Sequence, residues 1–341
     1  MHISNRNLNI DILRCLSIFI VISSHFGFRI HNSLDGTVGV VLFFIISGYC
    51  IQRSILKKNF LDFLKSRYLR LVPTFIICIS FTAVFEYLYK DLYTSRYHDM
   101  SLQYFLSNII CIPFGNFPCD FTRLYFKGAP TGFPFVDGVY WSLLVEFRYY
   151  ILISLIFLVC NKNYKVVIIT LSLFQFLSLI NSNLNFYSKE NDFALYLNFF
   201  IFGMIFYLYE IKKINFFYFL IPILNFFILS FLSVQGISLN LNMNNFIIYF
   251  STFFIFIFIM MLLNNKKNHL ISVAGYLTYP IYLIHYDVGR ILINELSIIL
   301  NKNISTTVVI FMIIFIAWVL DKTQILILRN ITNFFKFVKK E

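Results

Sequence analysis

Long apolar runs recur along the whole chain, and charged residues are concentrated in the stretches between them. A run of about 20 mostly apolar residues is long enough to cross a bilayer as a helix. The pattern predicts ten such helices, over residues 10–29, 36–56, 71–90, 140–160, 164–181, 193–210, 214–234, 245–263, 270–293 and 305–325. The sequence therefore predicts an all-α, polytopic membrane helix bundle.

Lys and Arg residues are unevenly divided between the two sets of predicted loops. Seventeen lie on the side that carries both termini, and seven lie on the opposite side. Because cytoplasmic loops are enriched in Lys and Arg, both termini should be cytoplasmic. The long connection 91–139 is then an external loop, and residues 326–341 form a cytoplasmic tail. We expect residues 1–341 to form a single integral-membrane domain.

The composition narrows the class of protein further. Hydrophobic residues make up 59% of the 341 residues and charged residues only 13%, whereas soluble proteins have about a quarter charged residues. A soluble enzyme is therefore excluded. The net charge of +12 follows from the basic loops and does not indicate a nucleic-acid partner. No small-residue cleavage site follows the first apolar run, so we interpret it as a retained helix.

The first predicted helix carries three ionisable residues, Asp11, Arg14 and His25. A charged group near the bilayer centre costs at least about 2.5–3.5 kcal/mol on insertion scales, so each requires an explanation. Arg14 and His25 are 11 residues apart, which places them on one helix face about 16 Å from each other. This spacing favours a polar stripe facing a cavity. The alternative is a snorkelling arginine and an interfacial histidine.

Two further segments contain polar residues next to the cytoplasmic half of the bundle. Ser47-Gly48-Tyr49 lies in the second predicted helix, where small residues indicate close helix packing or a path for a slender ligand. Arg67 and Arg70 are one helical turn apart, just before Pro73. Their charge agrees with a cytoplasmic loop, but two guanidinium groups so placed also suit a phosphorylated cytosolic ligand.

The fourth and ninth predicted helices place polar residues in the outer half of the bundle. Trp141, Ser142 and Glu146 begin the fourth helix. Glu146 should lie near the depth of His25, where a carboxylate could fix the histidine tautomer, although a structural ion pair is the alternative. Tyr282 and His285 follow Pro280 in the ninth helix, and this proline is expected to kink the helix.

The cysteines do not indicate a metal site, because no spacing of Cys or His is typical of one. Cys15, Cys50, Cys78 and Cys160 lie in predicted spans, where they serve as small apolar side chains. Cys111 and Cys119 lie in the predicted external loop. The short segment between them contains turn-forming residues, and its compartment should be oxidising, which favours a disulfide between Cys111 and Cys119. The alternative is two unpaired thiols packed beneath the aromatic residues of the loop.

These segments together resemble the acyltransferase 3 family of integral-membrane acyltransferases. The resemblance rests on five motifs in family order, which cover residues 8–325: Asp11 and Arg14 with His25; Phe43-Phe44 with Ser47-Gly48-Tyr49; Phe63 with Arg67, Arg70 and Pro73; Trp141-Ser142 with Glu146; and Tyr282-Leu283-Ile284-His285. Two positions depart from the family pattern. Tyr286-Asp287 stands where a proline often follows the last histidine, and Arg148 stands where an aromatic residue is usual.

The resemblance implies a bacterial inner-membrane enzyme that moves an acyl group, usually acetyl, from cytosolic acyl-CoA to a surface glycan. His25 takes the place of the catalytic histidine and Arg14 that of its paired arginine. Arg67 and Arg70 take the place of the cytoplasmic arginine pair, and Glu146 that of the carboxylate after Trp-Ser. Asp11, Trp141, Ser142, Tyr282 and His285 are expected in supporting roles.

A mechanism consistent with these assignments places acetyl-CoA and glycan on opposite sides of the bilayer. Arg67 and Arg70 would bind the CoA phosphates, and the pantetheine arm would pass the Ser47-Gly48-Tyr49 segment. His25, oriented by Glu146, would act as general base on a sugar hydroxyl, and no metal is required. A covalent acyl-His25 intermediate is the rival chemistry. The alternative functions are a transporter or flippase for a lipid-linked saccharide, in which buried charges line a pathway, and a glycan polymerase.

Overall fold

The computed structural model describes residues 7–27, 36–89, 102–114, 135–160, 163–182, 193–233, 243–262 and 268–338. Within these ranges the regular structure is helical and no strand occurs, which confirms the predicted all-α class. The described residues divide into two compact units. The first unit lies within Met1–Arg67 and Ser142–Gly275, and the second within Tyr68–Lys127, Pro134–Trp141 and Tyr276–Glu341.

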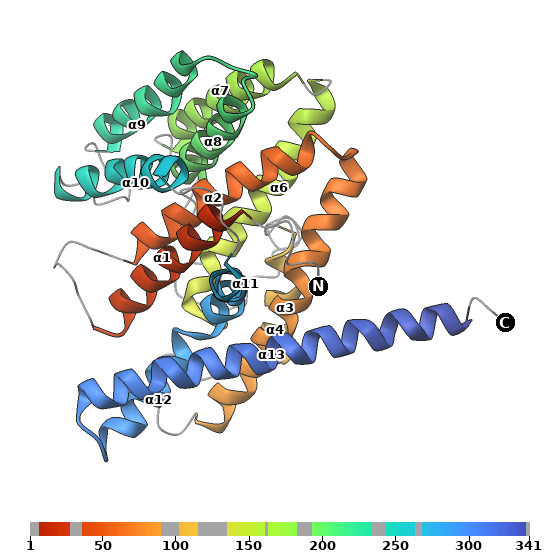
Figure 1. The fold of residues 1–341 in the computed structure, drawn as a ribbon, viewed down its shortest axis with the longest axis vertical. Helices are drawn as coiled ribbons and strands as arrows, with labels where there is room; N and C mark the ends of the chain where they lie inside the picture. Colours follow the sequence, from red (N-terminus) through yellow and green to blue (C-terminus); the bar gives the residue numbers. More distant parts are fainter. Residues whose placement is uncertain are drawn as a thin grey trace. The chain divides into compact units, whose positions relative to one another are not determined.

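The helices of the two units follow the order of the predicted apolar runs (Figure 1). The first unit contains α1 (Leu8–His25), α2 (Thr37–Ile55), all but the first residue of α6 (Trp141–Val159), α7 (Tyr164–Ser182), α8 (Phe193–Glu210), η4 (Phe216–Phe219), α9 (Leu220–Ser233) and α10 (Met243–Leu262). The second contains α4 (Leu102–Cys111), η3 (Gly138–Tyr140), α12 (Asp287–Ser297) and α13 (Lys302–Val338). Helices α3 (Phe60–Leu88) and α11 (His269–Ile284) contribute residues to both units.

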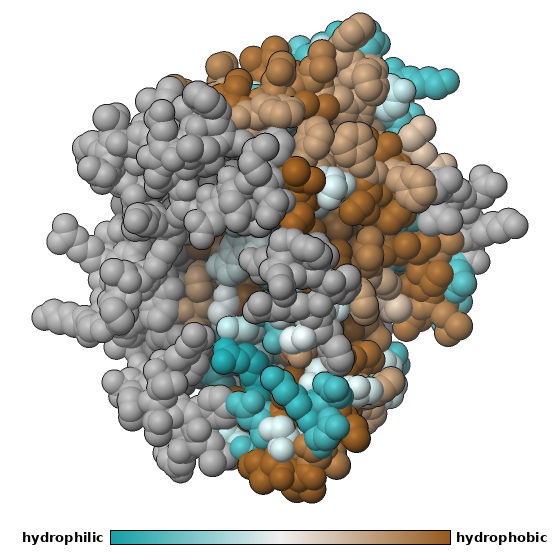
Figure 2. All heavy atoms as spheres, turned by 90° about the vertical axis from the view of Figure 1, so that its left-hand side faces the viewer, coloured by the Kyte–Doolittle hydropathy of each residue, from teal (hydrophilic) through white to brown (hydrophobic). Residues whose placement is uncertain are grey.

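Five described helices are long and apolar enough to cross a membrane: Leu8–His25, Thr37–Ile55, Phe60–Leu88, Gly138–Val159 and Lys302–Arg329. Five shorter apolar helices correspond to the remaining predicted runs: Tyr164–Leu177, Tyr196–Glu210, Phe216–Ile228, Ile247–Met261 and His269–Ile284. Hydrophobic side chains cover much of the described surface in Figure 2, beside a smaller hydrophilic area. Large apolar side chains exposed on the helices include Leu177, Phe254, Phe258, Phe311 and Phe315. These features agree with a polytopic membrane protein.

Two helices extend farther than their predicted apolar runs. Helix α3 begins at Phe60, so that Arg67 and Arg70 are helical residues. Helix α13 continues to Val338, through most of the predicted cytoplasmic tail. The long connection 91–139 contains helix α4. Neither residues 60–70 nor residues 326–338 contain Gly or Pro, so nothing in these sequences ends the helix where the apolar run ends.

The predicted ninth helix, 270–293, is interrupted after Ile284 and continues as α12 from Asp287. At the interruption, the carbonyl oxygen of Leu283 accepts a hydrogen bond from the Tyr140 hydroxyl at 3.1 Å. The Asp287 N–H, which would pair with that carbonyl in a continuous helix, instead donates to Asp137 Oδ2 at 3.3 Å. Side chains that replace an i→i−4 hydrogen bond in this way break a helix. The break therefore depends on residues that lie far away in the sequence.

Glycines bring helix backbones close together in the first unit. A β carbon on Gly48 of α2 would lie 2.1 Å from the Phe200 carbonyl oxygen of α8, and one on Gly203 would lie 2.0 Å from the Ile45 carbonyl oxygen. Gly39 of α2 packs on α1 in the same manner, beside the Ser17 carbonyl oxygen. Helix α2 thus lies between α1 and α8 (Figure 1). Any larger residue at these glycines would force the helices apart.

Candidate functional site

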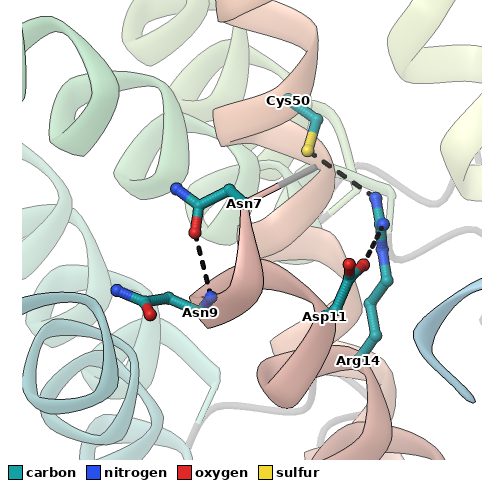
Figure 3. A network of polar contacts seen from close by, with 5 residues as sticks. All are labelled: Asn7, Asn9, Asp11, Arg14 and Cys50. Atoms are coloured by element: carbon teal, nitrogen blue, oxygen red, sulfur yellow. Dashed lines mark hydrogen bonds and ion pairs between the residues drawn. The ribbon is translucent and has the colours of Figure 1, made fainter. Parts of the chain in front are cut away.

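Arg14 is held within the first unit by partners on α1 and α2 (Figure 3). Its Nη1 lies 3.2 Å from Asp11 Oδ1, one turn earlier in α1, and its Nη2 donates to Cys50 Sγ of α2 at 3.7 Å. The Arg14 side chain is 13% exposed and that of Asp11 is 1% exposed. Removing one partner of such a buried pair leaves a buried polar group without its partner, so the two side chains depend on each other for their placement.

The polar contacts of α1 continue from Arg14 to the N-terminus of the helix. Asn7 caps the helix by accepting a hydrogen bond from the Asn9 N–H at 2.9 Å (Figure 3). The Asn9 side chain donates to the Met260 carbonyl oxygen of α10 at 3.1 Å. Gly275 provides the space for Asp11, since a β carbon there would lie 2.7 Å from Asp11 Cβ. The buried Asp11 carboxylate therefore depends on a residue without a side chain in α11.

His25 is the last residue of α1 and is half-buried. The chain leaves the helix through Gly27, whose φ of 84° is a left-handed conformation that favours glycine. The Gly36 N–H donates to Ser24 Oγ at 2.9 Å, and a β carbon on Gly36 would lie 3.5 Å from His25 Nε2. His25 and Arg14 thus both lie against the chain around α2, about 16 Å apart along one continuous helix.

Glu146 does not pair with His25 as the sequence predicted. Its Oε1 accepts hydrogen bonds from Ser47 of α2 and from Tyr150 of α6, the latter at 2.5 Å. His25 lies beside Gly36, and Ser47 follows Gly36 by 11 residues along α2, an axial distance of about 16 Å. The carboxylate is therefore closer in depth to Arg14 than to His25. The prediction was wrong because it inferred depth from helix ends alone.

The segment Ser47-Gly48-Tyr49 does not line a single path. Ser47 faces Glu146, and Gly48 faces the backbone of α8. Tyr49 is buried among α8 and α10 side chains and donates to Glu210 Oε2 at 2.6 Å. Successive residues of a helix are turned by about 100°, which separates these three neighbours. The close-packing interpretation of Gly48 is correct. A ligand-binding role for Tyr49 stays a prediction.

The two arginines of α3 are in different environments. Arg67 is buried, and its guanidinium carbon lies 5.4 Å from the centre of the Phe63 ring. Arg70, one turn later, is exposed. A guanidinium on an aromatic face gains a cation–π interaction, so Arg67 also has a packing role. Of the predicted phosphate-binding pair, Arg70 is the residue that is accessible to a ligand.

In the second unit, His285 is fully buried at the end of α11. Its Nδ1 lies 2.8 Å from the Tyr282 carbonyl oxygen, which can only accept, so Nδ1 carries the proton. The Tyr282 hydroxyl donates to the Val139 carbonyl oxygen at 3.2 Å. Both predicted supporting residues therefore bond to backbone groups around the helix break. Of the other three predicted supporting residues, Asp11 is described above, Trp141 is half-buried and Ser142 is buried.

Two buried carboxylates at the same break were not recognised as a pair from the sequence. Asp137 Oδ1 accepts from the Val139 N–H at 3.0 Å, and its Oδ2 accepts from the Asp287 N–H. Asp287 Oδ2 in turn accepts from the Gly138 N–H at 3.4 Å. Burial, and then the nearby Asp287 carboxylate, raise the pKa of Asp137 well above its usual range. Each aspartate thus caps the helical segment that the other begins.

Sequence reasoning also overlooked Tyr150 and Glu86. Tyr150 follows Glu146 by four residues, a spacing that places both on one helix face and could have been noticed. Glu86 is a charged residue inside an apolar run and is only 7% exposed in α3. Both of its carboxylate oxygens lack a hydrogen-bond partner among the described residues. In the sequence, Glu86 stands alone in its apolar run, without the neighbouring polar residues that mark Glu146 or His285.

The cysteines agree in part with the sequence prediction. Cys111 is disulfide-bonded, and Cys15, Cys50, Cys78 and Cys160 form no disulfide. Cys119, the partner predicted for Cys111, lies outside the described residues. Among the residues that the structure describes, no group of three or more His, Cys, Asp or Glu side chains is placed to hold a metal ion.

Apolar helices with ionisable side chains in their interior define a polytopic membrane protein with a polar internal site. The model of a family described as an acyltransferase domain matches residues 7–322, so the chain belongs to the acyltransferase 3 family. An O-acetyl transferase of Shigella phage Sf6 is 28% identical over 202 residues, which are 53% of this chain and 54% of that protein. A Bacillus subtilis protein whose name provisionally assigns it as a peptidoglycan O-acetyltransferase is 31% identical over 153 residues, which are 42% of this chain and 22% of that protein.

The chain spans about half the length of the first relative and about a fifth of the second. No solved structure matches the chain.

Proposed function

We propose that this protein transfers an acetyl group from cytosolic acetyl-CoA to a hydroxyl group of a cell-surface or lipid-linked glycan in a bacterial inner membrane. The observation that carries the proposal is the family match over 7–322, which includes the polar face of α1. The names of both relatives support acetyl as the group transferred, and the name of the Bacillus subtilis relative supports a glycan as the acceptor. O-antigen, capsule and exopolysaccharide are all acceptors of this class.

His25 is the proposed general base. It would take the proton of a sugar hydroxyl while the hydroxyl oxygen attacks the thioester carbonyl. The new C–O bond replaces the C–S bond, and the departing CoA thiolate recovers the proton from His25. General-base assistance is typically worth about 10²–10⁴-fold. Half-burial at the end of α1 agrees with this role, because the ring is both accessible and attached to a rigid helix. An acyl-His25 intermediate remains the alternative covalent route.

Arg14 is better placed to bind the acetyl-CoA donor than to contact the thioester carbonyl that reacts beside His25. Its guanidinium turns toward Asp11 and Cys50, away from the His25 end of α1. About 16 Å of helix separates the two residues, which is too far for both to contact one carbonyl group. A positive charge in the interior attracts the electron-rich oxygens of the donor. Arg70 would bind the CoA phosphates at the predicted cytoplasmic end.

A transport function would also place charges inside a helix bundle. Membership of an acyltransferase family favours acyl transfer. The two functions are separated by incubating purified protein with acetyl-CoA labelled in the acetyl group and with lipid-linked or surface glycans. We expect label in the glycan and stoichiometric free CoA. Movement of a saccharide across proteoliposomes without consumption of acetyl-CoA would contradict the proposal.

The proposed direction of transfer depends on the predicted orientation. Cysteines introduced at Lys302 should react with an impermeant reagent from outside the cell, whereas cysteines at Lys213 should react only after the membrane is opened. Labelling of Lys213→Cys from outside would require the opposite orientation and a different source of the donor.

A further inference from the structure

Glu146 is attached to its surroundings through only one of its two carboxylate oxygens. Ser47 and Tyr150 both donate to Oε1, one from α2 and the other from the next turn of α6. Within the described part of the chain, Oε2 accepts no hydrogen bond and no cation forms an ion pair with this carboxylate. The Glu146 side chain is half-buried. One oxygen is therefore fixed in direction, and the other is available to a hydrogen-bond donor.

A carboxylate in such a position needs more than two hydroxyl partners. An ionised carboxylate accepts up to about four hydrogen bonds, and a lost partner at a buried charge costs more than one at a neutral group. Ser47 and Tyr150 occupy Oε1 and fix the rotamer of Glu146. Because none of the described residues supplies a donor to Oε2, a bound molecule that brings an N–H or O–H group would complete the site.

The depth of Glu146 indicates which substrate it meets. Ser47 lies about 16 Å along α2 from the chain beside His25, toward the end of α1 that carries Arg14. In the predicted orientation that end faces the cytoplasm, from which acetyl-CoA enters. A donor that reaches His25 with its thioester must leave the rest of its arm at the depth of Glu146.

The chemistry of the donor narrows the contact further. The phosphates of CoA are anionic and are repelled by a carboxylate, and the thioester has no hydrogen to donate. The pantetheine arm between them carries two amide N–H groups, and its one hydroxyl group lies at the far end, beside the phosphates that a carboxylate repels. Resting on the proposed acetyl-CoA function, we propose that Glu146 Oε2 accepts a hydrogen bond from an amide N–H of the pantetheine arm, with Ser47 and Tyr150 as positioning residues that direct this oxygen.

The test compares acetyl-pantetheine with two analogues in which an ester oxygen replaces one or the other amide N–H. Wild-type protein should lose about 10- to 100-fold in kcat/KM with one of the two analogues, the usual effect of removing a hydrogen bond to a charged group. Glu146→Ala should lose a similar factor with acetyl-pantetheine and show no further loss with that analogue. Glu146→Gln, which keeps the side-chain shape, should show an intermediate loss if Glu146→Ala does not fold.

The positioning role is tested by removing one hydroxyl at a time. Tyr150→Phe should raise the KM for acetyl-pantetheine about 3- to 10-fold with a small change in kcat, because the carboxylate remains but is less well directed. The matched control is Tyr149→Phe in the same helix, where the ring stacks on Phe200 at 4.1 Å and lies outside this network. The control should change the KM less than twofold.

Each other outcome is informative. The loss in kcat/KM from Glu146→Ala and the loss from the ester analogue could instead multiply when the two changes are combined. That result would show that the carboxylate and the amide N–H do not meet, and it would overturn the inference. A rise in the KM for the glycan alone would assign Oε2 to the acceptor and overturn it as well. If wild-type protein transfers no acetyl group from acetyl-CoA or from acetyl-pantetheine, the proposed function itself fails.

Discussion

The two units of the molecule bury ionisable groups in different ways. In the first unit, Arg14 is paired with Asp11, and Glu146 is held by two hydroxyl groups through one oxygen. In the second unit, Asp137 and Asp287 accept hydrogen bonds from backbone N–H groups, and His285 donates to a carbonyl oxygen. The first arrangement connects side chains to one another, whereas the second connects side chains to backbone.

This difference distinguishes side chains that are available for catalysis from side chains that support the fold. Backbone groups at a buried helix break must be satisfied inside the protein, because an unpaired buried N–H or C=O group is costly. Asp137, Asp287 and His285 serve that requirement at the interruption between α11 and α12. Glu146 and His25 are not required by any broken helix and are only half-buried. We therefore expect substitutions in the first unit to change turnover and substitutions in the second to change stability.

The largest expected effect is the loss of transfer in His25→Ala. Removal of a general base should lower kcat about 10²–10⁴-fold while thermal unfolding changes little, because the ring is half-buried at a helix end. The measurement is acetyl transfer by the purified protein, normalised to the folded fraction. Near wild-type transfer in a folded sample would exclude the role.

His285→Ala provides the contrast to this result. His285 is fully buried against the Tyr282 carbonyl oxygen, so its loss should lower the apparent Tm and reduce turnover per folded molecule less than His25→Ala does. If His285→Ala lowered turnover per folded molecule as much as His25→Ala does, the distinction between the two units would be wrong.

Asp137→Ala should destabilise the second unit by about 2 kcal/mol, because two backbone N–H groups, those of Val139 and Asp287, lose their acceptor. Asp137→Asn retains one oxygen and should cost less. Thermal unfolding in detergent, followed at several heating rates, measures the difference. An Asp137→Ala protein as stable as wild type would show that the reciprocal caps do not hold the helix break.

Arg70→Ala should raise the KM for acetyl-CoA about tenfold, because an exposed guanidinium that binds phosphate is lost. Arg70→Lys should recover only part of this affinity, since lysine lacks the bidentate fork. Arg67→Ala is the comparison: its effect should fall mainly on stability, through the lost contact with the Phe63 ring. Donor binding that is unchanged in Arg70→Ala would remove this residue from the donor site.

The last effect concerns pH, and over one pH unit it is no larger than the effects above. The pKa of Asp137 is raised in the folded protein, first by burial and then by Asp287, so folding favours the protonated form. Its stabilising contribution is complete below the unfolded pKa of about 3.9 and is lost as the pH rises through the folded pKa. Stability should fall over this range by up to about 1.4 kcal/mol per pH unit. Asp137→Asn should show a flatter profile in unfolding measured against pH, and an identical slope would contradict the prediction.

Much of the architecture could be predicted from the apolar runs alone. Each of the ten runs corresponds to an apolar helix, because the length and hydrophobicity that favour a span are properties of about 20 neighbouring residues. The arrangement of Arg14 and His25 on one side of α1 was likewise predicted from their spacing, because α1 is an uninterrupted helix from Leu8 to His25.

The contacts between helices were decided by the tertiary structure. The break after Ile284 needs Tyr140 and Asp137, and the partners of Glu146 are Ser47 and Tyr150 rather than His25. Gly48 contacts the backbone of α8 and does not open a path. Helices that are apolar on every side carry little information about their rotation or depth, since lipid and protein neighbours are equally apolar. The sequence therefore determines which segments become helices, and the packing of those helices decides which polar side chains meet.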